Sequence, residues 1–363
     1  MALTPDDTNA SISERDRSSV FHSWSAQRSL APLPLAGGSG SEVWDVDGRR
    51  YLDFSSQLVN VNIGHQHPRV VAAIQEQAAQ LTTVAPAHAN ATRARAAELI
   101  LERAPEGFAK VFFTNGGADA NENAIRMARL FTGRDKVIST YRSYHGNTGA
   151  AIVATGDWRR IPNEFDRYGI VLILDEVMAG FARAGEWFAF DAFGVTPDLV
   201  TFAKGVNSGY VPLGGVIISD EIARTFDDRV FPGGLTYSGH PLAAASAVAT
   251  IEAMADEKIV EHAARMGTDV LGPRLRQIAE RHAVVGEVRG RGVFWAVELV
   301  ADRETREPLA AERMGALKKD LLDQGLLGFF AENRLHVVPP AVVTESELDR
   351  GLTIIDAALG RLG

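Results

Sequence analysis

The 363-residue chain contains no cysteine, which excludes disulfide bridges, thiolate metal ligands and a cysteine nucleophile. We expect no metal site. No run of residues approaches the roughly 20 apolar residues that a transmembrane helix needs. The first twenty residues are polar and lack the apolar core of a signal peptide. We therefore expect a soluble, cytoplasmic protein that does not bind membranes.

An excess of basic charge is also missing, because 37 Lys and Arg stand against 46 Asp and Glu, giving a formal net charge of −9. Nucleic-acid binding normally needs a basic surface, so we expect no nucleic-acid partner. Hydrophobic residues make up 46% of the chain and charged residues 23%, as in ordinary globular proteins. The length exceeds one ordinary domain and can bury a large core.

Strand and helix patterns alternate through the first two thirds of the chain. The run EVWDVDGRRYLDF predicts a hairpin around Asp47 and Gly48. Helical spacing of apolar residues predicts helices over Pro68 to Leu81 and Arg93 to Arg103. Further strands are predicted in KVFFTN, KVIST, AAIVAT, IVLILDEV, LVTFA and GGVIIS, with a helix in ADANENAIRMARLF after the first. Continuous apolar strands between amphipathic helices indicate an α/β fold with a mostly parallel sheet covered on both faces.

The pattern changes after about Ala255. Long helices in ALKKDLLDQG and ESELDRGLTIIDAAL accompany strands in GVFWAVEL and RLHVVPP, which is typical of a smaller α+β domain. We therefore expect an N-terminal segment over residues 1–64 that contributes to the small domain. A large domain would span 65–255, and a C-terminal small domain 256–363.

Lys204 lies in the glycine-rich run TFAKGVNSGYVPLGG, and Asp175 ends the preceding apolar run IVLILDEV. Such a pair can hold a pyridine ring. The amine condenses with an aldehyde, and the carboxylate keeps the ring nitrogen protonated so that the ring accepts electrons. Alone, the pair is more often an acid that caps a helix or binds a metal, together with a solvated lysine.

The run FFTNGGADANENAIRMAR passes from a strand through Gly116, Gly117 and Ala118 directly into a helix. Backbone amides at a helix N-terminus, open to close approach because glycine lacks Cβ, can cradle a phosphate. The alternative is a plain strand-to-helix turn. The spacing fits neither a Walker motif nor a dinucleotide fingerprint.

Two further residues have a functional and a structural interpretation. Tyr144 follows the predicted strand KVIST and could stack on a flat cofactor ring, or be a half-buried tyrosine with a bonded hydroxyl. Thr236 precedes a predicted helix at Pro241 and could donate to a phosphate, or cap a turn.

In this order the segments resemble the class III aminotransferases, pyridoxal-phosphate enzymes often called ω-transaminases. The resemblance rests on DVDGRRYLDF, NIGHQHPRVVAAI, FFTNGGADANENAIRMAR, YHG, LILDEVMAGF, TFAKGVNSGYVPLGG, TYSGHPLAAASA, RGRGVFWAVEL and VVPP, and covers most of the chain. It implies pyridoxal-phosphate fold type I, the aspartate-aminotransferase type, with the cofactor in the large domain. It also implies a homodimer with shared active sites.

Applied residue by residue, the resemblance implies that Lys204 binds the cofactor aldehyde and moves the proton between substrate and cofactor. Asp175 would pair with the pyridinium nitrogen, while Val177 and Tyr144 would pack on the two ring faces.

The phosphate would be held by backbone amides of the Gly116, Gly117 and Ala118 turn, with Thr236 reaching it from the partner subunit. Family members commonly carry serines in this turn. Gly116 and Ala118 replace them here, so backbone amides must supply more of the binding.

Five residues are expected near the substrate. Leu58 and Val59 stand where many relatives place an aromatic residue, and Trp24 could close the pocket or belong to the core. Relatives that hold a carboxylate often have an arginine before the final Pro-Pro. Here Phe329 lies in that segment, and Arg334 is its only guanidinium.

The resemblance implies a transaminase that moves an amino group from an ω-amino acid or amine to a keto acid such as pyruvate. An aminomutase or decarboxylase on the same scaffold is an alternative, because the same lysine-bound cofactor supports those reactions. A catalytically impaired, cofactor-binding homologue is another.

That last alternative depends on the joint between Phe165 and Asp166. Only fourteen residues, 156–169, separate AAIVAT from the next predicted strand. A crossover needs at least about 10–12 residues and normally a helix, yet Pro162 interrupts the only candidate. Relatives carry several dozen more residues here. We therefore expect that Phe165 and Asp166 are not bonded neighbours and that a segment is missing between them. A genuine deletion would favour the impaired homologue.

Overall fold

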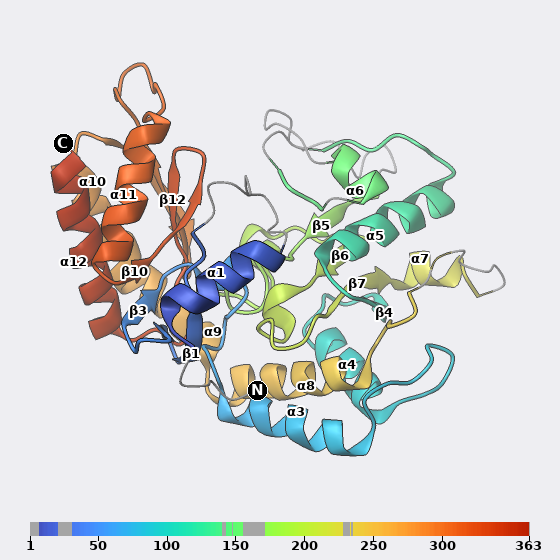
Figure 1. The fold of residues 1–363 in the computed structure, drawn as a ribbon. Coiled ribbons are helices and arrows are strands. Elements are labelled where there is room, and N and C mark those ends of the chain that lie inside the picture. Colours follow the sequence, from blue (N-terminus) through green and yellow to red (C-terminus); the bar gives the residue numbers. More distant parts are fainter. Residues whose placement is uncertain are drawn as a thin grey trace.

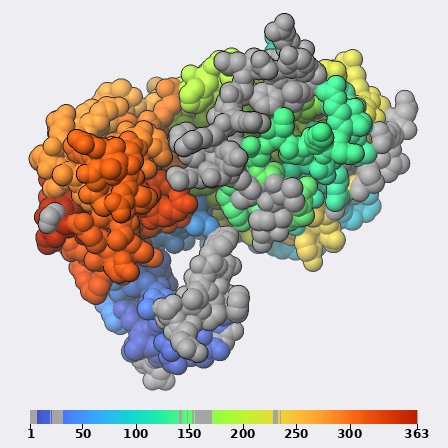
Figure 2. All heavy atoms as spheres, turned by 90° about the horizontal axis from the view of Figure 1, so that it is seen from above, coloured from blue at the N-terminus to red at the C-terminus, as the bar shows by residue number. Residues whose placement is uncertain are grey.

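The computed structural model describes residues 7–20, 31–139, 143–146, 148–154, 171–227, 233 and 235–362. Within these ranges the strands form three four-stranded sheets. Figure 1 shows the small sheets beside the C-terminal helices and the large sheet between two groups of helices. In the space-filling view the C-terminal residues gather in one lobe and the residues around the large sheet in another (Figure 2).

The large sheet has the strand order β4-β7-β6-β5. Its strands are β4 (Phe108–Thr114), β5 (Ile173–Asp175), β6 (Leu199–Phe202) and β7 (Gly214–Ser219). Strand β7 is antiparallel to both neighbours, and β5 is parallel to β6. Three of the four strands therefore run in one direction, and the predicted α/β class is confirmed.

Helices pack on both sides of this sheet (Figure 1). One side carries α5 (Gly117–Thr132) and α6 (Gly149–Ala154), and the other carries α3 (Pro68–Gln80), α4 (Ala91–Leu101) and α8 (Pro241–Asp256). The chain also forms α7 (Asp220–Arg224) and the 3₁₀ helices η3 (Ala189–Phe193) and η4 (Lys204–Val206). The helices predicted around residues 68–81 and 93–103 are thus confirmed within a few residues.

The two smaller sheets join the ends of the chain. One contains β1 (Leu35–Ser39), β2 (Glu42–Asp45), β3 (Arg50–Asp53) and β10 (Leu326–Leu327); the other contains β8 (Val285–Arg291), β9 (Phe294–Leu299), β11 (Phe329–Ala331) and β12 (Arg334–Val337). The predicted β2–β3 hairpin turns at Gly48, whose φ of 85° favours glycine. Because β3 pairs in parallel with β10, we propose that residues 1–64 belong with the small domain.

The remaining helices are α1 (Asn9–Ser19), the irregular α2 (Ser56–Val59), α9 (Ile259–Arg265), the π-helix η5 (Met266–Leu271), α10 (Gly272–Arg281), α11 (Ala311–Asp323) and α12 (Glu345–Leu362). Helices α10, α11 and α12 lie together beside the labelled strands β10 and β12 (Figure 1). The change of pattern after residue 255 supports our proposed division into 65–255 and 256–363. Over the described ranges, every helix is too short or too polar to cross a membrane.

Two predicted strands are wrong. The run AAIVAT lies in helix α6, because a short apolar run fits either structure. Here a carboxylate oxygen of Glu122 accepts the backbone N–H groups of Ala150 at 2.7 Å and Ala151 at 3.2 Å, which caps the first helical turn. In KVIST, residues 136–139 form no strand. At the β5 edge of the large sheet, β5 is only three residues long, and its described pairing is with β6.

Candidate active site

The carboxylate of Asp175 lies at the end of β5, opposite Thr201 of β6. Asn121 of α5 donates to Asp175 Oδ2 at 2.9 Å and itself accepts from the Thr201 hydroxyl at 2.7 Å. His145 Nδ1 lies 2.7 Å from the same Oδ2 atom. Side chains from a helix, a neighbouring strand and a loop therefore fix this acid in one orientation.

Asn121 and His145 were not among the residues predicted from the sequence. Asn121 is 5% exposed although it is polar, and it lies one turn after the Gly116–Gly117 turn. His145 is the middle residue of the YHG motif, of which only the tyrosine was interpreted. Two signals could have found them. Asn121 is a polar residue on an apolar helix face, and His145 is a second titratable group in the motif that contains Tyr144.

Lys204 begins η4 directly after β6, with φ of 41°. A non-glycine residue in this left-handed region is strained, and such strain is common at functional sites. Burial lowers the pKa of the Lys204 amine; Asp175 opposes this lowering, while the cation of Arg183 adds to it. Asp175 and Lys204 thus follow the same ends of two parallel strands, where ligands bind in open α/β sheets.

The turn before α5 is closely packed on one side and open on the other. A Cβ at Gly117 would lie 2.8 Å from Val177 Cγ1, and one at Gly146 would lie 2.5 Å from the Ala118 Cβ. A Cβ at Gly116 would meet nothing within 4 Å, and no side chain caps the helix. The first amides of this 16-residue helix therefore suit an anion such as phosphate.

Tyr144 and Thr236 lie at the borders of this arrangement. Tyr144 is 55% exposed and precedes His145. Thr236 is also exposed, and the nearby Ser238 hydroxyl donates to the Phe113 carbonyl at 2.6 Å. That bond ties the Thr236 loop to the end of β4, just before the glycine turn.

The expected substrate residues have different surroundings. Leu58 is 42% exposed, whereas Val59 is 1% exposed and packs inside. The Phe329 ring lies 5.1 Å from the ring of His336. Arg334 Nη2 pairs with Glu332 at 3.0 Å. Trp24 lies outside the described residues.

A buried arginine joins three parts of the chain near Lys204. Arg183 is fully buried; Nη1 donates to the Pro339 carbonyl and Nη2 to Asn62 Oδ1, both at 2.5 Å. Burial lowers the pKa of Arg183 to about 9, and nearby Asp53 opposes this lowering. The group therefore remains a cation at neutral pH. Arg183 was not among the residues predicted from the sequence.

These residues fit a phosphorylated pyridine aldehyde: the Asp175 carboxylate for the ring nitrogen, the Lys204 amine for the aldehyde and the α5 amides for the phosphate. No group of three or more His, Cys, Asp or Glu side chains that could hold a metal occurs in the described part of the chain. The fold and this donor set define a pyridoxal-phosphate-dependent enzyme of fold type I.

Comparison with known proteins identifies the family. The model of the family "Aminotransferase class-III" matches residues 25–166 and 163–359. The chain belongs to this family, and it is a pyridoxal-phosphate-dependent aminotransferase. The taurine:2-oxoglutarate aminotransferase of Bifidobacterium kashiwanohense, solved with pyridoxal phosphate and glutamate, is 36% identical, with a TM-score of 0.93 over 99% of both chains.

Two curated relatives are similar over nearly their whole length. Acetylornithine aminotransferase of Methanothermobacter thermautotrophicus is 33% identical over 409 residues, which cover 97% of this chain and 99% of the relative. Taurine–pyruvate aminotransferase of Rhodobacter capsulatus is 30% identical over 450 residues, covering 97% of each. Both alignments are longer than the 363-residue chain, so the relatives carry residues that this chain lacks.

The joint between Phe165 and Asp166 lies outside the described residues. The two family matches meet at residues 163–166, which is where the sequence analysis expected a missing segment. One premise of that expectation is wrong, since AAIVAT belongs to helix α6 and not to a strand. The break in the family match supports it independently.

Proposed function

We propose that this transaminase moves an amino group from an ω-amino acid or amine to a keto acid such as pyruvate. The observation that carries the proposal is the placement of Asp175 and Lys204 after adjacent parallel strands, with the open amides of α5 nearby. Support for an ω-amino donor comes from two similar proteins that are named for taurine, an amine whose acidic group is not on the amino-bearing carbon.

Lys204 would bind the cofactor aldehyde and then carry the substrate proton. Its lowered pKa increases the share of uncharged amine, the form that can act as nucleophile or base. Asp175, oriented by Asn121 and His145, would keep the ring nitrogen protonated. The bound cofactor supplies an electron sink for the bond to the substrate carbon.

The phosphate would bind the amides of Gly116, Gly117 and Ala118. Val177 packs against Gly117, which supports its proposed place on one ring face. Tyr144 would cover the other face.

We also propose a homodimer in which Thr236 reaches the partner's phosphate. Thr236 is exposed in the single chain, and the adjacent Tyr237 is 61% exposed, so a partner surface would cover both. Light scattering of the cofactor-loaded protein should give twice the chain mass. A fully active monomer would contradict the shared site.

Cytoplasmic localisation stays a prediction.

The experiment that tests the reaction is a panel of ω-amino acids and amines against pyruvate and 2-oxoglutarate, followed through the cofactor spectrum. Pyruvate should be the better acceptor, because Phe329 and Phe330 offer no cation to a second carboxylate and Arg334 pairs with Glu332. A clear preference for 2-oxoglutarate would show that the site does offer a cation to the second carboxylate of the acceptor. Release of CO₂ or an isomerised amine without amino transfer would favour the decarboxylase or aminomutase.

We propose that a segment separates Phe165 from Asp166 in the active enzyme. The family match in two pieces supports this. The intact mass of the natural protein decides between the alternatives. A mass several kilodaltons above the 39.1 kDa of the 363-residue chain supports a missing segment. A mass of 39.1 kDa, with cofactor binding but no turnover, would favour the impaired homologue.

A further inference from the structure

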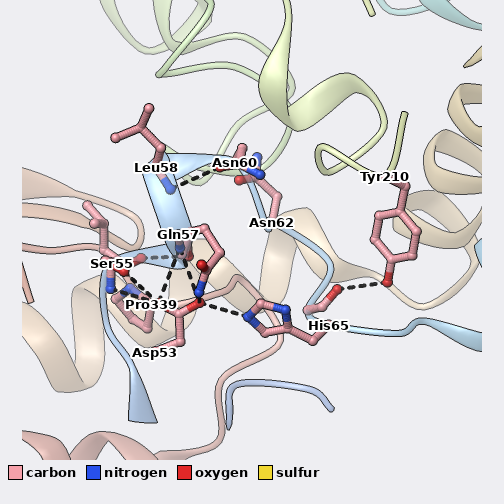
Figure 3. A network of polar contacts seen from close by, with 12 residues as sticks. Asp53, Ser55, Gln57, Leu58, Asn60, Asn62, His65, Tyr210 and Pro339 are labelled. Carbon is pink, nitrogen blue, oxygen red and sulfur yellow. Dashed lines mark hydrogen bonds and ion pairs between the residues drawn. The ribbon is translucent and has the colours of Figure 1, made fainter. Parts of the chain in front are cut away.

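A buried carboxylate at the end of β3 organises the loop that follows it. The Asp53 side chain is fully buried and accepts from the Ser55 hydroxyl at 2.7 Å, Gln57 Nε2 at 2.9 Å and the Gln57 backbone N–H at 3.1 Å. His65 Nε2 lies 2.7 Å from Asp53 Oδ2. Figure 3 shows these groups converging on Asp53, while Leu58 points away from them.

The loop held by Asp53 has an unfavourable backbone. Ser56, Gln57 and Val59 have φ values of 45°, 57° and 58°, in the left-handed region that residues with a Cβ rarely adopt. Three such residues within four positions need outside contacts to keep their conformation. Asp53 supplies them at Gln57, and the Ser56 hydroxyl donates to the Val338 carbonyl at 2.6 Å.

The far end of the same loop touches the turn that carries Lys204. The backbone N–H of Ile63 donates to the Ser208 hydroxyl at 3.1 Å, and the Asn60 side chain occupies the space that a Cβ at Gly209 would need. Asn60 Oδ1 also accepts the Leu58 backbone N–H at 3.0 Å. The exposed Leu58 side chain therefore stands on a loop fixed between the Asp53 cluster and the Lys204 turn.

We propose that Asp53 is a positioning residue for the amino donor, acting through Gln57 on the loop that presents Leu58 beside the Lys204 turn. Asp53 does not touch the substrate itself. The proposal rests on the proposed function, because it assigns the exposed Leu58 to the donor's path to Lys204.

The electrostatics of the cluster agree with this role. Burial alone would raise the pKa of Asp53, but hydrogen bonds from His65, Ser55 and Gln57 outweigh it, and the pKa of Asp53 lies below its usual range. The carboxylate is thus an anion with all its donors inside the protein. Replacing it by an amide removes the charge and turns one acceptor into a donor, which faces other donors.

The test is the nearly isosteric variant Asp53→Asn, with Asp45→Asn as matched control. Asp45 is also buried, and it accepts hydrogen bonds at 2.9 Å from both the Tyr51 hydroxyl and the Arg49 backbone N–H. None of its described hydrogen bonds reaches residues 56–59. In Asp53→Asn, the KM for the donor should rise about tenfold or more with kcat changed less than about threefold. Hydrogen exchange of the Gln57 and Leu58 amides should accelerate about tenfold or more. The control should show neither change.

Unchanged KM and unchanged exchange in Asp53→Asn would overturn the proposal, as would equal effects in Asp45→Asn. If Asp53→Asn does not fold, Gln57→Ala is the second variant, because it removes the side-chain donor of Gln57 to Asp53. The donor KM and the amide exchange rate should then both rise, but by less than in Asp53→Asn. No change in either quantity would overturn the proposal. Hydrogen exchange does not require turnover. A wild-type protein inactive with every donor would therefore refute the proposed function, while exchange would still test the hold of Asp53 on the loop.

Discussion

Nδ1 of His145 lies 2.7 Å from Oδ2 of Asp175, the same oxygen that accepts a hydrogen bond from Asn121 at 2.9 Å. The other oxygen accepts the Val177 backbone N–H at 3.0 Å. Asp175 is therefore held in one orientation by contacts at both of its carboxylate oxygens. An anion fixed in this way can stabilise a positive charge placed next to it.

Asp175→Asn should lower kcat by several powers of ten, on the order of 4 kcal/mol or more in activation free energy, because a neutral amide cannot stabilise a pyridinium. Cofactor affinity should fall less. Steady-state rates and cofactor titration measure the two effects. Asp198→Asn is the control: Asp198 accepts the Leu172 backbone N–H at 2.7 Å, at the opposite end of β5 and β6. A near-normal rate in Asp175→Asn would leave that carboxylate a structural role only.

Borohydride reduction of the purified yellow protein should fix the cofactor mass on Lys204, since its amine is the one beside Asp175. Peptide mass spectrometry locates the adduct. Recovery on Lys110 or Lys136 would refute the assignment.

Lys204→Ala should still bind cofactor but lose turnover, because the group that moves the proton is gone.

Arg183→Lys should destabilise the fold by about 2–4 kcal/mol, because an ammonium cannot reach both the Pro339 carbonyl and Asn62 as the guanidinium does. The denaturant midpoint measures the loss. The control is Arg291→Lys, where an exposed Arg291 pairs with Glu186 at 2.9 Å and less than about 1 kcal/mol is expected. Equal losses in both variants would mean that the buried contacts add nothing.

His336 predicts a pH dependence of stability. Burial, together with the cations of Arg334 and Arg289, lowers the pKa of His336 from 6.5 to about 4. Between pH 6.5 and about 4, the His336 side chain binds more protons in the unfolded chain than in the folded one. The free energy of unfolding should therefore fall as the pH falls through this range. The loss should reach on the order of 3 kcal/mol at most.

His336→Phe removes this titration and keeps a ring of similar size beside Phe294 and Phe329. Denaturant unfolding at several pH values measures the free energy of unfolding of both proteins. Between pH 6.5 and about 4, the wild type should lose stability relative to His336→Phe. A constant difference would contradict the lowered pKa.

The sequence predicted the elements whose signals are local. Asp175 ends an apolar run, Lys204 follows the next one, and the structure places both at the ends of parallel strands. The hairpin at Gly48 and the helix beginning at Pro68 also depend on single residues, because glycine tolerates the positive φ of the turn and proline fixes φ at the helix start.

Features that depend on contacts between distant segments could not be read in this way. The helix at Ala150 is fixed by Glu122, and the Asp175 cluster draws on Asn121 and His145 from two other segments. Arg183 was not singled out from the sequence. Its importance comes from burial against Asn62 and Pro339, which no local pattern encodes.

The contact between Gly117 and Val177 has a consequence for redesigning this enzyme. Any side chain at position 117 would start only 2.8 Å from Val177, so substitution there would displace the valine from its proposed place on the ring face. Libraries that vary one position at a time would discard position 117 as intolerant of any side chain. Paired libraries that enlarge 117 while shrinking 177 would search combinations that single-site screening never samples.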